Sequence, residues 1–264
     1  MNSKISLVFC TCDRYESLWA NFFQLWKKYW PGFNSQVILN TETSNFSYAG
    51  LGIVRPMFSK DHLSWSERLY ESLEMVQTPY VILTLDDFYL KSDVDVDAIE
   101  VCIRQMDTDS SVGLFTFAPQ PGNNKSCDFS DRFEKRARMA PYRINAQIGL
   151  WRVSYLKSIL RMYENPWEFE LNGSFRSMFS AVKLYSLKKG VPLVFDYDWG
   201  FLIVRGQLNR EVAEHFINNE MIEFDDSFTD IDMDAYRALG RNKKGRLLRL
   251  LKYFYKMVLS LFRK

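Results

Sequence analysis

Two kinds of hydrophobic pattern alternate along the first third of the chain. Residues 5–10, 36–40 and 80–85 are short apolar runs with little polar alternation, which is the pattern of strands buried on both faces of a sheet. Between these runs, apolar side chains recur at helical spacing over residues 17–30 and after Ser64. This order of strand, helix, strand, helix and strand predicts a doubly wound α/β sheet.

The rest of the chain continues the alternation less regularly. Residues 128–143 are charged and irregular, so we expect a flexible loop over a site, and the six acids of residues 223–234 indicate a solvated loop. Pro166 suits the first position of a helix that Asn165 caps. The other expected elements are helices over 96–106, 154–163 and 210–218, and strands over 112–117, 145–152 and 191–197.

Two adjacent carboxylates, Asp86 and Asp87, follow the run 80–85 directly. Neighbouring acids at the end of a buried strand repel each other and lose solvation, so they need a compensating partner. A divalent cation that carries a phosphate-bearing substrate is a simple partner of this kind. Ligands of open α/β sheets bind beyond the carboxyl ends of the strands. The pair therefore predicts a substrate site, and a solvated acidic loop is the structural alternative.

The composition bounds the class of protein and its partners. The 264 residues are 47% hydrophobic and 16% aromatic, which is typical of a globular protein. A net charge of +2 gives no general signature of nucleic-acid binding. The sequence contains no apolar run long enough to span a bilayer. No secretory signal precedes the four cysteines, so we expect reduced thiols and a cytoplasmic location.

The last stretch, residues 241–264, differs in charge from the rest of the chain. It contains nine basic residues and no acid. Its apolar side chains recur at helical spacing, which predicts a basic amphipathic helix on an anionic membrane surface. A helix packed on the protein core is the alternative. The apolar positions are Leu247, Leu250, Leu251, Phe254, Val258, Leu261 and Phe262.

The turn after the first strand is a candidate nucleotide site. In a doubly wound sheet a mononucleotide binds at this position, so Thr11, Asp13 and Arg14 are candidate donor-binding residues. No glycine-rich phosphate loop is present, which excludes a Walker A site and a Rossmann fingerprint.

Arg68 is a second candidate for phosphate binding. It lies in the first turn of the helix that Ser64 is expected to cap, where the helix dipole disfavours a cation. An anion should therefore lie nearby. A nucleotide pyrophosphate would serve, and a salt bridge to Glu42 or Glu71 is the structural alternative.

Together these motifs resemble a known family. The first strand, the turn Thr11-Cys12-Asp13-Arg14, the helix start Trp65-Ser66-Glu67-Arg68 and the strand end Leu85-Asp86-Asp87-Phe88 resemble the nucleotide-sugar half of a GT-A glycosyltransferase. More narrowly, they resemble small bacterial enzymes of capsule and O-antigen assembly. The resemblance implies a divalent cation, Mn²⁺ or Mg²⁺, held by Asp86 and Asp87 on the donor diphosphate. Because Phe88 takes the place of a further acid, one aspartate alone holding the ion, or metal-independent transfer, stays open.

The second half resembles the acceptor region of inverting members of that family. Residues 145–152 are followed by a helix and then by the run 165–170, NPWEFE. In the family a helix start of this kind bears the carboxylate that deprotonates the acceptor. Glu168 takes the third helical position of a capping box, so Glu170 is the favoured catalytic base and Glu168 the alternative.

Three further residues are candidate acceptor contacts. Trp151 and Trp167 can stack on sugar faces, although core packing is the commoner role of tryptophan. Gln147 can bind a sugar hydroxyl, with strand-edge hydrogen bonding as the alternative. The resemblance covers roughly residues 5–206.

The sequence thus leads to one main functional expectation. We expect a catalytic domain over residues 1–240, with a nucleotide-sugar half (1–118) and an acceptor half (119–240), followed by the membrane-associating helix 241–264. The resemblance implies a glycosyltransferase that extends a lipid-linked glycan at the inner face of the cell membrane. A sugar-phosphate nucleotidylyltransferase and a non-catalytic glycan-binding protein are the alternatives; the missing glycines of the 11–14 turn argue against the first.

Overall fold

The computed structural model describes residues 1–198, 201–239 and 257–262. Within this part of the chain one mixed sheet of nine strands has the order β3-β2-β1-β4-β8-β5-β9-β7-β6. Its strands are β1 (Ile5–Cys10), β2 (Val37–Asn40), β3 (Ile53–Val54), β4 (Tyr80–Leu85), β5 (Val112–Pro119), β6 (Lys125–Cys127), β7 (Ser130–Lys135), β8 (Gly149–Arg152) and β9 (Lys183–Leu187).

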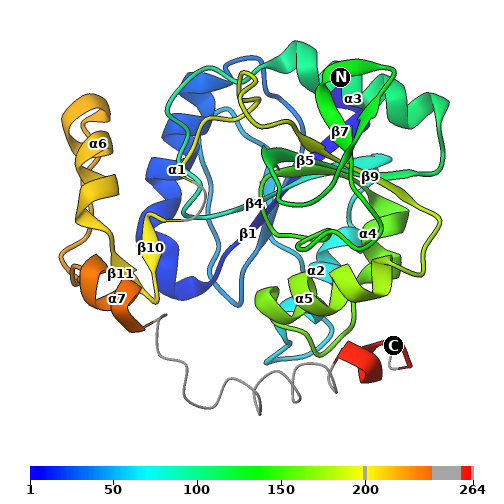
Figure 1. Ribbon diagram of the computed structural model, residues 1–264. Coiled ribbons are helices and arrows are strands. Elements are labelled where there is room, and N and C mark those ends of the chain that lie inside the picture. The colour runs from blue at the N-terminus through cyan, green and yellow to red at the C-terminus, as the bar shows by residue number, and fades with distance from the viewer. Residues whose placement is uncertain (199–200, 240–256, 263–264) are drawn as a thin grey trace.

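Helices cover both faces of this sheet, which gives three layers (Figure 1). One core cluster joins the sheet to α1, α3 and α6, and the other joins it to α2, α4 and α5. This confirms the predicted α/β class. The helices are α1 (Glu16–Tyr29), α2 (Trp65–Glu74), α3 (Val96–Thr108), α4 (Val153–Ile159), α5 (Pro166–Ser177), α6 (Arg210–Glu220) and α7 (Met233–Leu239).

The central strands show why their sequences are apolar throughout. In β1, Leu7 and Phe9 pack into one core cluster, whereas Val8 and Cys10 pack into the other. Strand β1 pairs in parallel with both β2 and β4. The chain thus leaves β1 for β2 on one side and later returns to β4 on its other side. A doubly wound sheet has its ligand crevice at such a point, beyond the carboxyl ends of the two strands.

The second half differs from the sequence prediction in two places. Residues 128–143 are not simply a loop, because β7 pairs antiparallel with β9 and with β6 at the sheet edge. The charged residues of β7 hid this strand, since only Phe133 faces the core. The predicted strand 191–197 is wrong: the main-chain carbonyls of Val194 and Asp196 accept hydrogen bonds from the connection before α3 rather than from a strand.

Strand β8 is shorter than predicted and runs antiparallel between β4 and β5. Residues 145–148 precede it as an irregular segment. Ala146 and Gln147 of this segment line the crevice, so they are available to bind a ligand. Similarly, α4 ends at Ile159 and not at residue 163, so an irregular connection leads from α4 into α5.

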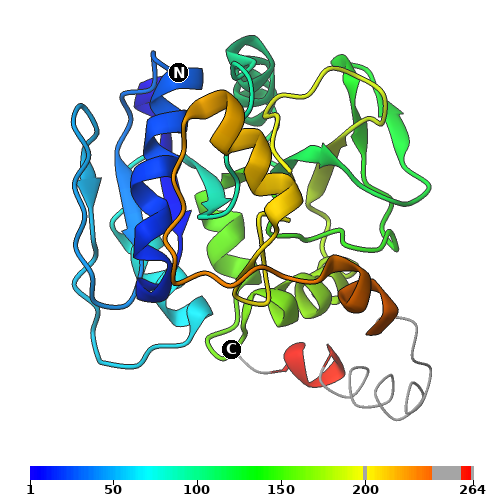
Figure 2. The same cartoon turned by 90° about the vertical axis from the view of Figure 1, so that its left-hand side faces the viewer.

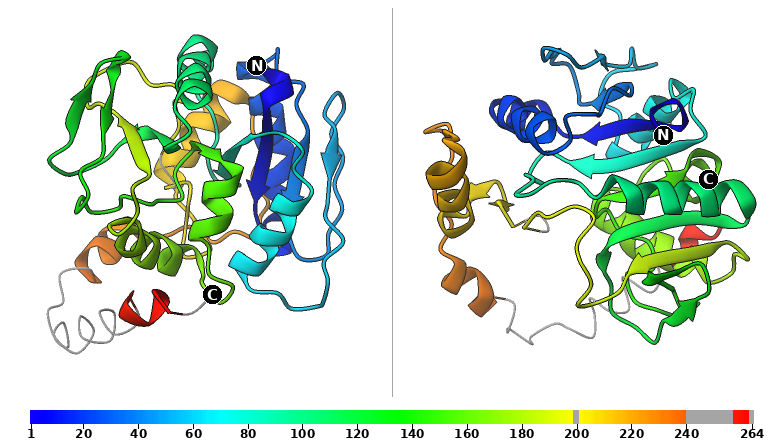
Figure 3. Two further views of the ribbon diagram at one scale, coloured as in Figure 1. Left: turned by 90° about the vertical axis from the view of Figure 1, so that its right-hand side faces the viewer. Right: turned by 90° about the horizontal axis from the view of Figure 1, so that it is seen from above.

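A short hairpin and the end of the chain complete the described structure. Strands β10 (Ile203–Val204) and β11 (Gln207–Leu208) pair antiparallel, and α6 follows them along the outside of α1 (Figure 2). Of the predicted helix 241–264, only residues 257–262 are among those described, and they form a helical turn beside α5 (Figures 1 and 3). In the described residues no helix is long and apolar enough to cross a membrane.

Candidate active site

A pocket of about 540 Å³ opens beyond the carboxyl ends of β1 and β4. Six segments that are distant in sequence line it: the end of β1 with its turn, the start of α2, the end of β4, residues 146–147, the start of α5 and the β10–β11 hairpin. The side chains that carry chemistry are Thr11, Arg14, Arg68, Asp86, Asp87, Gln147, Trp167, Glu170 and Arg205.

Asp86 lies at the inner end of this pocket and is only 8% exposed. The Thr11 hydroxyl donates a hydrogen bond to its carboxylate, and Trp19 Nε1 donates to Thr11 Oγ1 over 2.7 Å. Burial, followed by the charge of Asp87, raises the pKa of Asp86. Thr11 is therefore a support for Asp86, in addition to lining the pocket as predicted.

Asp87 completes the acid pair. Burial raises the pKa of Asp87, and the nearby backbone of Ile203 in β10 acts in the opposite direction. Two adjacent carboxylates in a buried position disfavour each other's charge, so a cation bound beside them would relieve this cost. Oxygen ligands of this kind suit Mg²⁺ or Mn²⁺. Groups of three or more metal-ligating side chains are absent from the described residues, so the pair would need the substrate's phosphates or water as further ligands.

Glu170 lines the same pocket from α5. Its Oε1 accepts a hydrogen bond from the Ala146 backbone N–H over 2.8 Å, which fixes the carboxylate in place. Burial raises the pKa of Glu170. A fixed carboxylate with a raised pKa is well suited to accept a proton near neutral pH.

Glu168 has the structural role that its position predicts. Its backbone N–H donates to Asn165 Oδ1 over 2.9 Å, and its side chain accepts from the Asn165 N–H over 3.4 Å. These two bonds form the capping box of α5. Glu168 does not line the pocket, so the geometry favours Glu170 over Glu168 as the base.

Trp167 and Gln147 line the pocket from the start of α5 and from the segment before β8. Trp167 is 73% exposed, which leaves a face of its indole open to a ligand. Gln147 Oε1 accepts a hydrogen bond from the Tyr197 hydroxyl over 2.9 Å, so its amide is held at the pocket wall. Trp151 is different: it is fully buried between Tyr155 and Phe169. Its predicted stacking on a sugar is wrong, because its indole packs in the protein core.

Arg68 forms the salt bridge to Glu42 that the sequence left open as the structural alternative. Its Nη2 lies 2.9 Å from Glu42 Oε1, and its Nη1 donates to the Leu63 carbonyl over 3.2 Å. However, its Nε is buried and has no hydrogen-bond partner in the described structure. Arg68 also lines the pocket. The salt bridge is thus real, and part of the guanidinium remains for an anion.

Asp13 requires a correction. Its carboxylate accepts hydrogen bonds from Thr41 Oγ1 over 2.7 Å and from the backbone N–H groups of Thr43 and Ser44. Burial acts to raise its pKa, but the bonds from Thr43, Thr41 and Ser44 outweigh burial and lower it. Asp13 does not line the pocket. We therefore reassign it from a donor contact to a tether for the loop after β2.

The β10–β11 hairpin is the part of the site that the sequence did not reveal. It contributes Ile203, Arg205 and Gly206 to the pocket. Two-residue strands are too short to give a readable alternation. The only signal is the Arg205-Gly206 pair, since glycine is favoured in two-residue hairpin turns.

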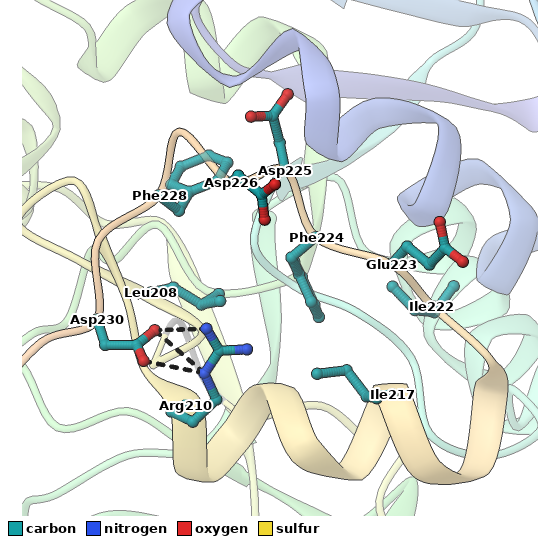
Figure 4. A pocket seen from close by; sticks show the side chains of 10 residues that line it. All are labelled: Leu208, Arg210, Ile217, Ile222, Glu223, Phe224, Asp225, Asp226, Phe228 and Asp230. Atoms are coloured by element: carbon teal, nitrogen blue, oxygen red, sulfur yellow. Dashed lines mark hydrogen bonds and ion pairs between the residues drawn. The ribbon is translucent and has the colours of Figure 1, made fainter.

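A second pocket of about 820 Å³ lies between α6 and the acidic loop that follows it (Figure 4). Its basic side chain, Arg210, is neutralised by Asp230 at 2.8 Å. The remaining lining is apolar or acidic and lies away from the strand ends. It therefore offers neither the acid pair nor the buried glutamate of the first pocket, which remains the candidate active site.

Comparison with solved structures identifies the fold. S. aureus TarS superposes with a TM-score of 0.50 at 12% identity, over 85% of this chain and 41% of that chain. TarS 1-349 with UDP-GlcNAc gives a TM-score of 0.46 at 10% identity, over 85% of this chain and 68% of that one. A Drosophila β1,4-galactosyltransferase 7 mutant with manganese, UDP-Gal and xylobiose gives 0.40 at 11% identity, over 74% and 70%.

Sequence comparisons add nothing to this likeness. Neither the protein-family models nor the curated proteins match the chain. The chain spans about two fifths of the length of that TarS chain, and an identity of 12% shows the fold alone. The mixed sheet flanked by helices and the superposition on TarS together give the chain the GT-A glycosyltransferase fold.

Proposed function

We propose that this protein is a glycosyltransferase that uses a nucleoside-diphosphate sugar as donor. The observation that carries the proposal is the meeting of Asp86, Asp87 and Glu170 in one pocket at the switch point of the sheet. A transferase of this kind needs a clamp for the leaving diphosphate and a base for the acceptor hydroxyl. The known complexes of the structural neighbours with UDP-GlcNAc, and with manganese and UDP-Gal, support the choice of donor class.

The roles follow from the chemistry of the side chains. Asp86 and Asp87 would hold a Mn²⁺ or Mg²⁺ ion, which when bound neutralises charge on the leaving diphosphate. Thr11 keeps Asp86 in place, and Arg68 adds positive charge at the wall of the same pocket. Glu170 takes the proton of the acceptor hydroxyl, and this hydroxyl then attacks the anomeric carbon in an inverting displacement. Trp167 and Gln147 orient the acceptor sugar.

A thermal-shift panel tests the donor class directly. We expect nucleoside diphosphates with Mn²⁺ to raise the melting temperature, because a ligand at 100 times its Kd stabilises the folded state by about 2.7 kcal/mol. UDP and GDP are the first two to test. Stabilisation by nucleoside triphosphates instead would indicate a nucleotidylyltransferase, and no response to any nucleotide would indicate a glycan-binding protein. Either result would overturn the proposal.

The acceptor side suggests where the enzyme works. Along α5 and just beyond it, Trp167, Leu171 and Phe179 are 73%, 37% and 67% exposed. Phe175, at the same helical spacing, contacts Phe179 with ring centroids 5.5 Å apart. This apolar stripe starts at the pocket, so a ligand bound along it would lie next to Glu170.

The described end of the chain reinforces the stripe. The turn over residues 257–262 lies beside α5, where the Ser260 carbonyl accepts a hydrogen bond from Arg161 Nε over 3.2 Å. Phe262 in this turn is 81% exposed, and the surrounding sequence 241–264 is basic without acids. We propose that this face rests on an anionic membrane and that the acceptor is a lipid-linked glycan, as in bacterial capsule or O-antigen assembly at the inner face of the cell membrane.

The double substitution Leu171→Ser with Phe179→Ser is expected to weaken binding to anionic vesicles about tenfold. Losing even ~1.4 kcal/mol of apolar burial lowers a binding constant by that factor. The measurement is flotation with phosphatidylcholine vesicles that contain phosphatidylglycerol. The matched control is Met57→Ser with Met221→Ser, since these side chains are 93% and 88% exposed in the connections that follow β3 and α6. The control should bind as the wild type does.

A chain that ends at Gly240 extends the test to the basic tail. It should keep donor binding and lose vesicle binding. If this shorter chain unfolded, residues 241–264 would be part of the folded core. If it bound vesicles as well as the full chain does, these residues would not contact the membrane.

A further inference from the structure

The turn of the β10–β11 hairpin has an unusual backbone for its sequence. Arg205 has a φ of 55° and Gly206 a φ of 80°, so both residues lie in the left-handed region. Glycine and asparagine are common in this region, whereas arginine is not. Residues in disfavoured backbone conformations often serve a binding site. Arg205 and Gly206 both line the active-site pocket.

Two contacts hold this turn at the pocket. The backbone of Ile203, at the start of the hairpin, lies close enough to the Asp87 carboxylate to favour its charged form. On the other side, the Arg205 guanidinium lies over the ring of Tyr236 in α7, 5.1 Å from its centroid. The hairpin is thus tied to the acid pair, and its cation is supported from behind by an aromatic face.

A second cation meets the same turn. The guanidinium of Arg14 packs so closely on Gly206 that a Cβ atom there would lie 3.0 Å from Arg14 Nη2. Only a glycine leaves this space at a φ of 80°. Arg14 and the residue next to Gly206, Arg205, are therefore neighbours at the mouth of the pocket.

Neither cation is neutralised within the described structure. Among residues 1–198, 201–239 and 257–262, no carboxylate forms an ion pair with Arg14 or with Arg205. The third arginine of the pocket, Arg68, is by contrast bound to Glu42. Both side chains line the same pocket, so an anion bound between them would be stabilised by both positive charges. Planar guanidinium groups match phosphate oxygens with two hydrogen bonds each.

We propose that Arg14 and Arg205 form a clamp for the diphosphate of the donor and of the nucleoside-diphosphate product. This inference rests on the proposed function and adds a source of positive charge that belongs to the protein itself. The clamp acts on the phosphate oxygens that face the hairpin, while Asp86 and Asp87 face the same pocket from the end of β4. A nucleoside diphosphate should therefore bind even when a chelator removes divalent cations.

The test compares affinities by isothermal titration calorimetry in EDTA. The ligands are five nucleoside diphosphates (UDP, GDP, ADP, CDP and dTDP) with their monophosphates and nucleosides. For the diphosphate that binds, Arg205→Asn and Arg14→Gln should each raise the Kd about 10- to 100-fold, the usual range for a lost charge-assisted hydrogen bond. The Kd of the matching nucleoside should not change.

The choice of Arg205→Asn separates binding from folding. Asparagine tolerates a left-handed φ, so the melting temperature should stay the same or rise. The matched control is Arg237→Asn, which removes an exposed arginine of α7 that pairs with Asp234 at 3.5 Å outside the pocket. This control should bind diphosphate as the wild type does.

The outcomes distinguish this inference from the function on which it rests. Wild-type diphosphate affinity in both Arg205→Asn and Arg14→Gln would overturn the clamp and leave the glycosyltransferase proposal standing. Diphosphate binding that disappears entirely in EDTA would also overturn the clamp, since the metal alone would then hold the phosphates. If the wild type binds no nucleoside diphosphate with or without Mn²⁺, the proposed function itself falls.

Discussion

Replacing Glu170 with glutamine is expected to lower turnover by roughly 100- to 10,000-fold, the usual contribution of a general base. The amide keeps the size of the side chain and can still accept the hydrogen bond from the Ala146 N–H, but it takes no proton from the acceptor. Donor affinity should not change, because Glu170 lies on the acceptor side. The measurement is the initial rate of sugar transfer, with donor binding measured in parallel.

The pH dependence provides an independent check on Glu170. Burial raises its pKa, and a base must be unprotonated to act. The rate should therefore fall as the pH drops through this raised pKa, at a higher pH than an ordinary glutamate would give. In Glu170→Gln the remaining activity should lose that step.

Glu168→Gln is the matched control, two residues away on the same helix. It weakens the capping box and should cost on the order of 1 kcal/mol of unfolding free energy with little change in rate. If Glu168→Gln lost turnover and Glu170→Gln lost only stability, the two roles would be reversed. If neither lost turnover, the reaction would need no base of this kind and would be a retaining transfer.

Replacing Asp87 with asparagine is expected to reduce transfer about 100- to 1000-fold, which corresponds to ~2.7–4 kcal/mol of lost electrostatic stabilisation. Asp86→Asn should have a similar effect, with added disturbance of the bond from Thr11. Circular dichroism should show that both variants fold. Wild-type rates in both variants would exclude the acid pair from the reaction, and a wild-type rate that a chelator leaves unchanged would exclude the metal.

The same pair predicts how stability depends on pH. Burial raises both pKa values in the folded state, so the folded protein binds more protons than the unfolded chain. Without metal, the contribution of the pair to stability is present at acid pH and is lost as the pH rises above about 4 toward neutrality. Asp87→Asn should lose less stability over this pH range, because it removes one of the two charges. Mn²⁺ should reduce the loss of stability in the wild type and not in this variant. If the free energy of unfolding instead rose over this pH range in both the wild type and Asp87→Asn, the prediction would be contradicted.

The first half of the fold was predictable because each element carries its own signal. Strands β1 and β4 are continuous apolar runs buried on both faces, and α2 begins with a complete capping box at Ser64. The second half has weaker signals. Strand β7 buries only Phe133, and β9 mixes lysine and serine with its apolar residues. Their place in the sheet comes from long-range pairing that a local pattern does not encode.

The sequence predicted those residues of the candidate site whose place follows from the order of the strands. The carboxyl ends of β1 and β4 must meet, which brings Thr11 to Asp86. Side-chain direction does not follow from position, and so Asp13 and Trp151 were assigned to a pocket that they do not reach. Arg205 escaped notice because the turn that presents it is defined by its backbone and its distant neighbours.

The connection into α5 is fastened to the start of α2. The Ser66 N–H donates to the Glu164 carbonyl over 3.3 Å, and the Glu164 N–H donates to Ser66 Oγ over 2.9 Å. Ser64 Oγ adds a hydrogen bond to the Met162 carbonyl. The helix that carries Arg68 and the helix that carries Glu170 are therefore one mechanical unit. A chimera could exchange the second half of the chain between relatives in order to change the acceptor. The boundary between the two parts would then cut these hydrogen bonds. Residues 64–66 would have to be transferred together with the second half to keep them.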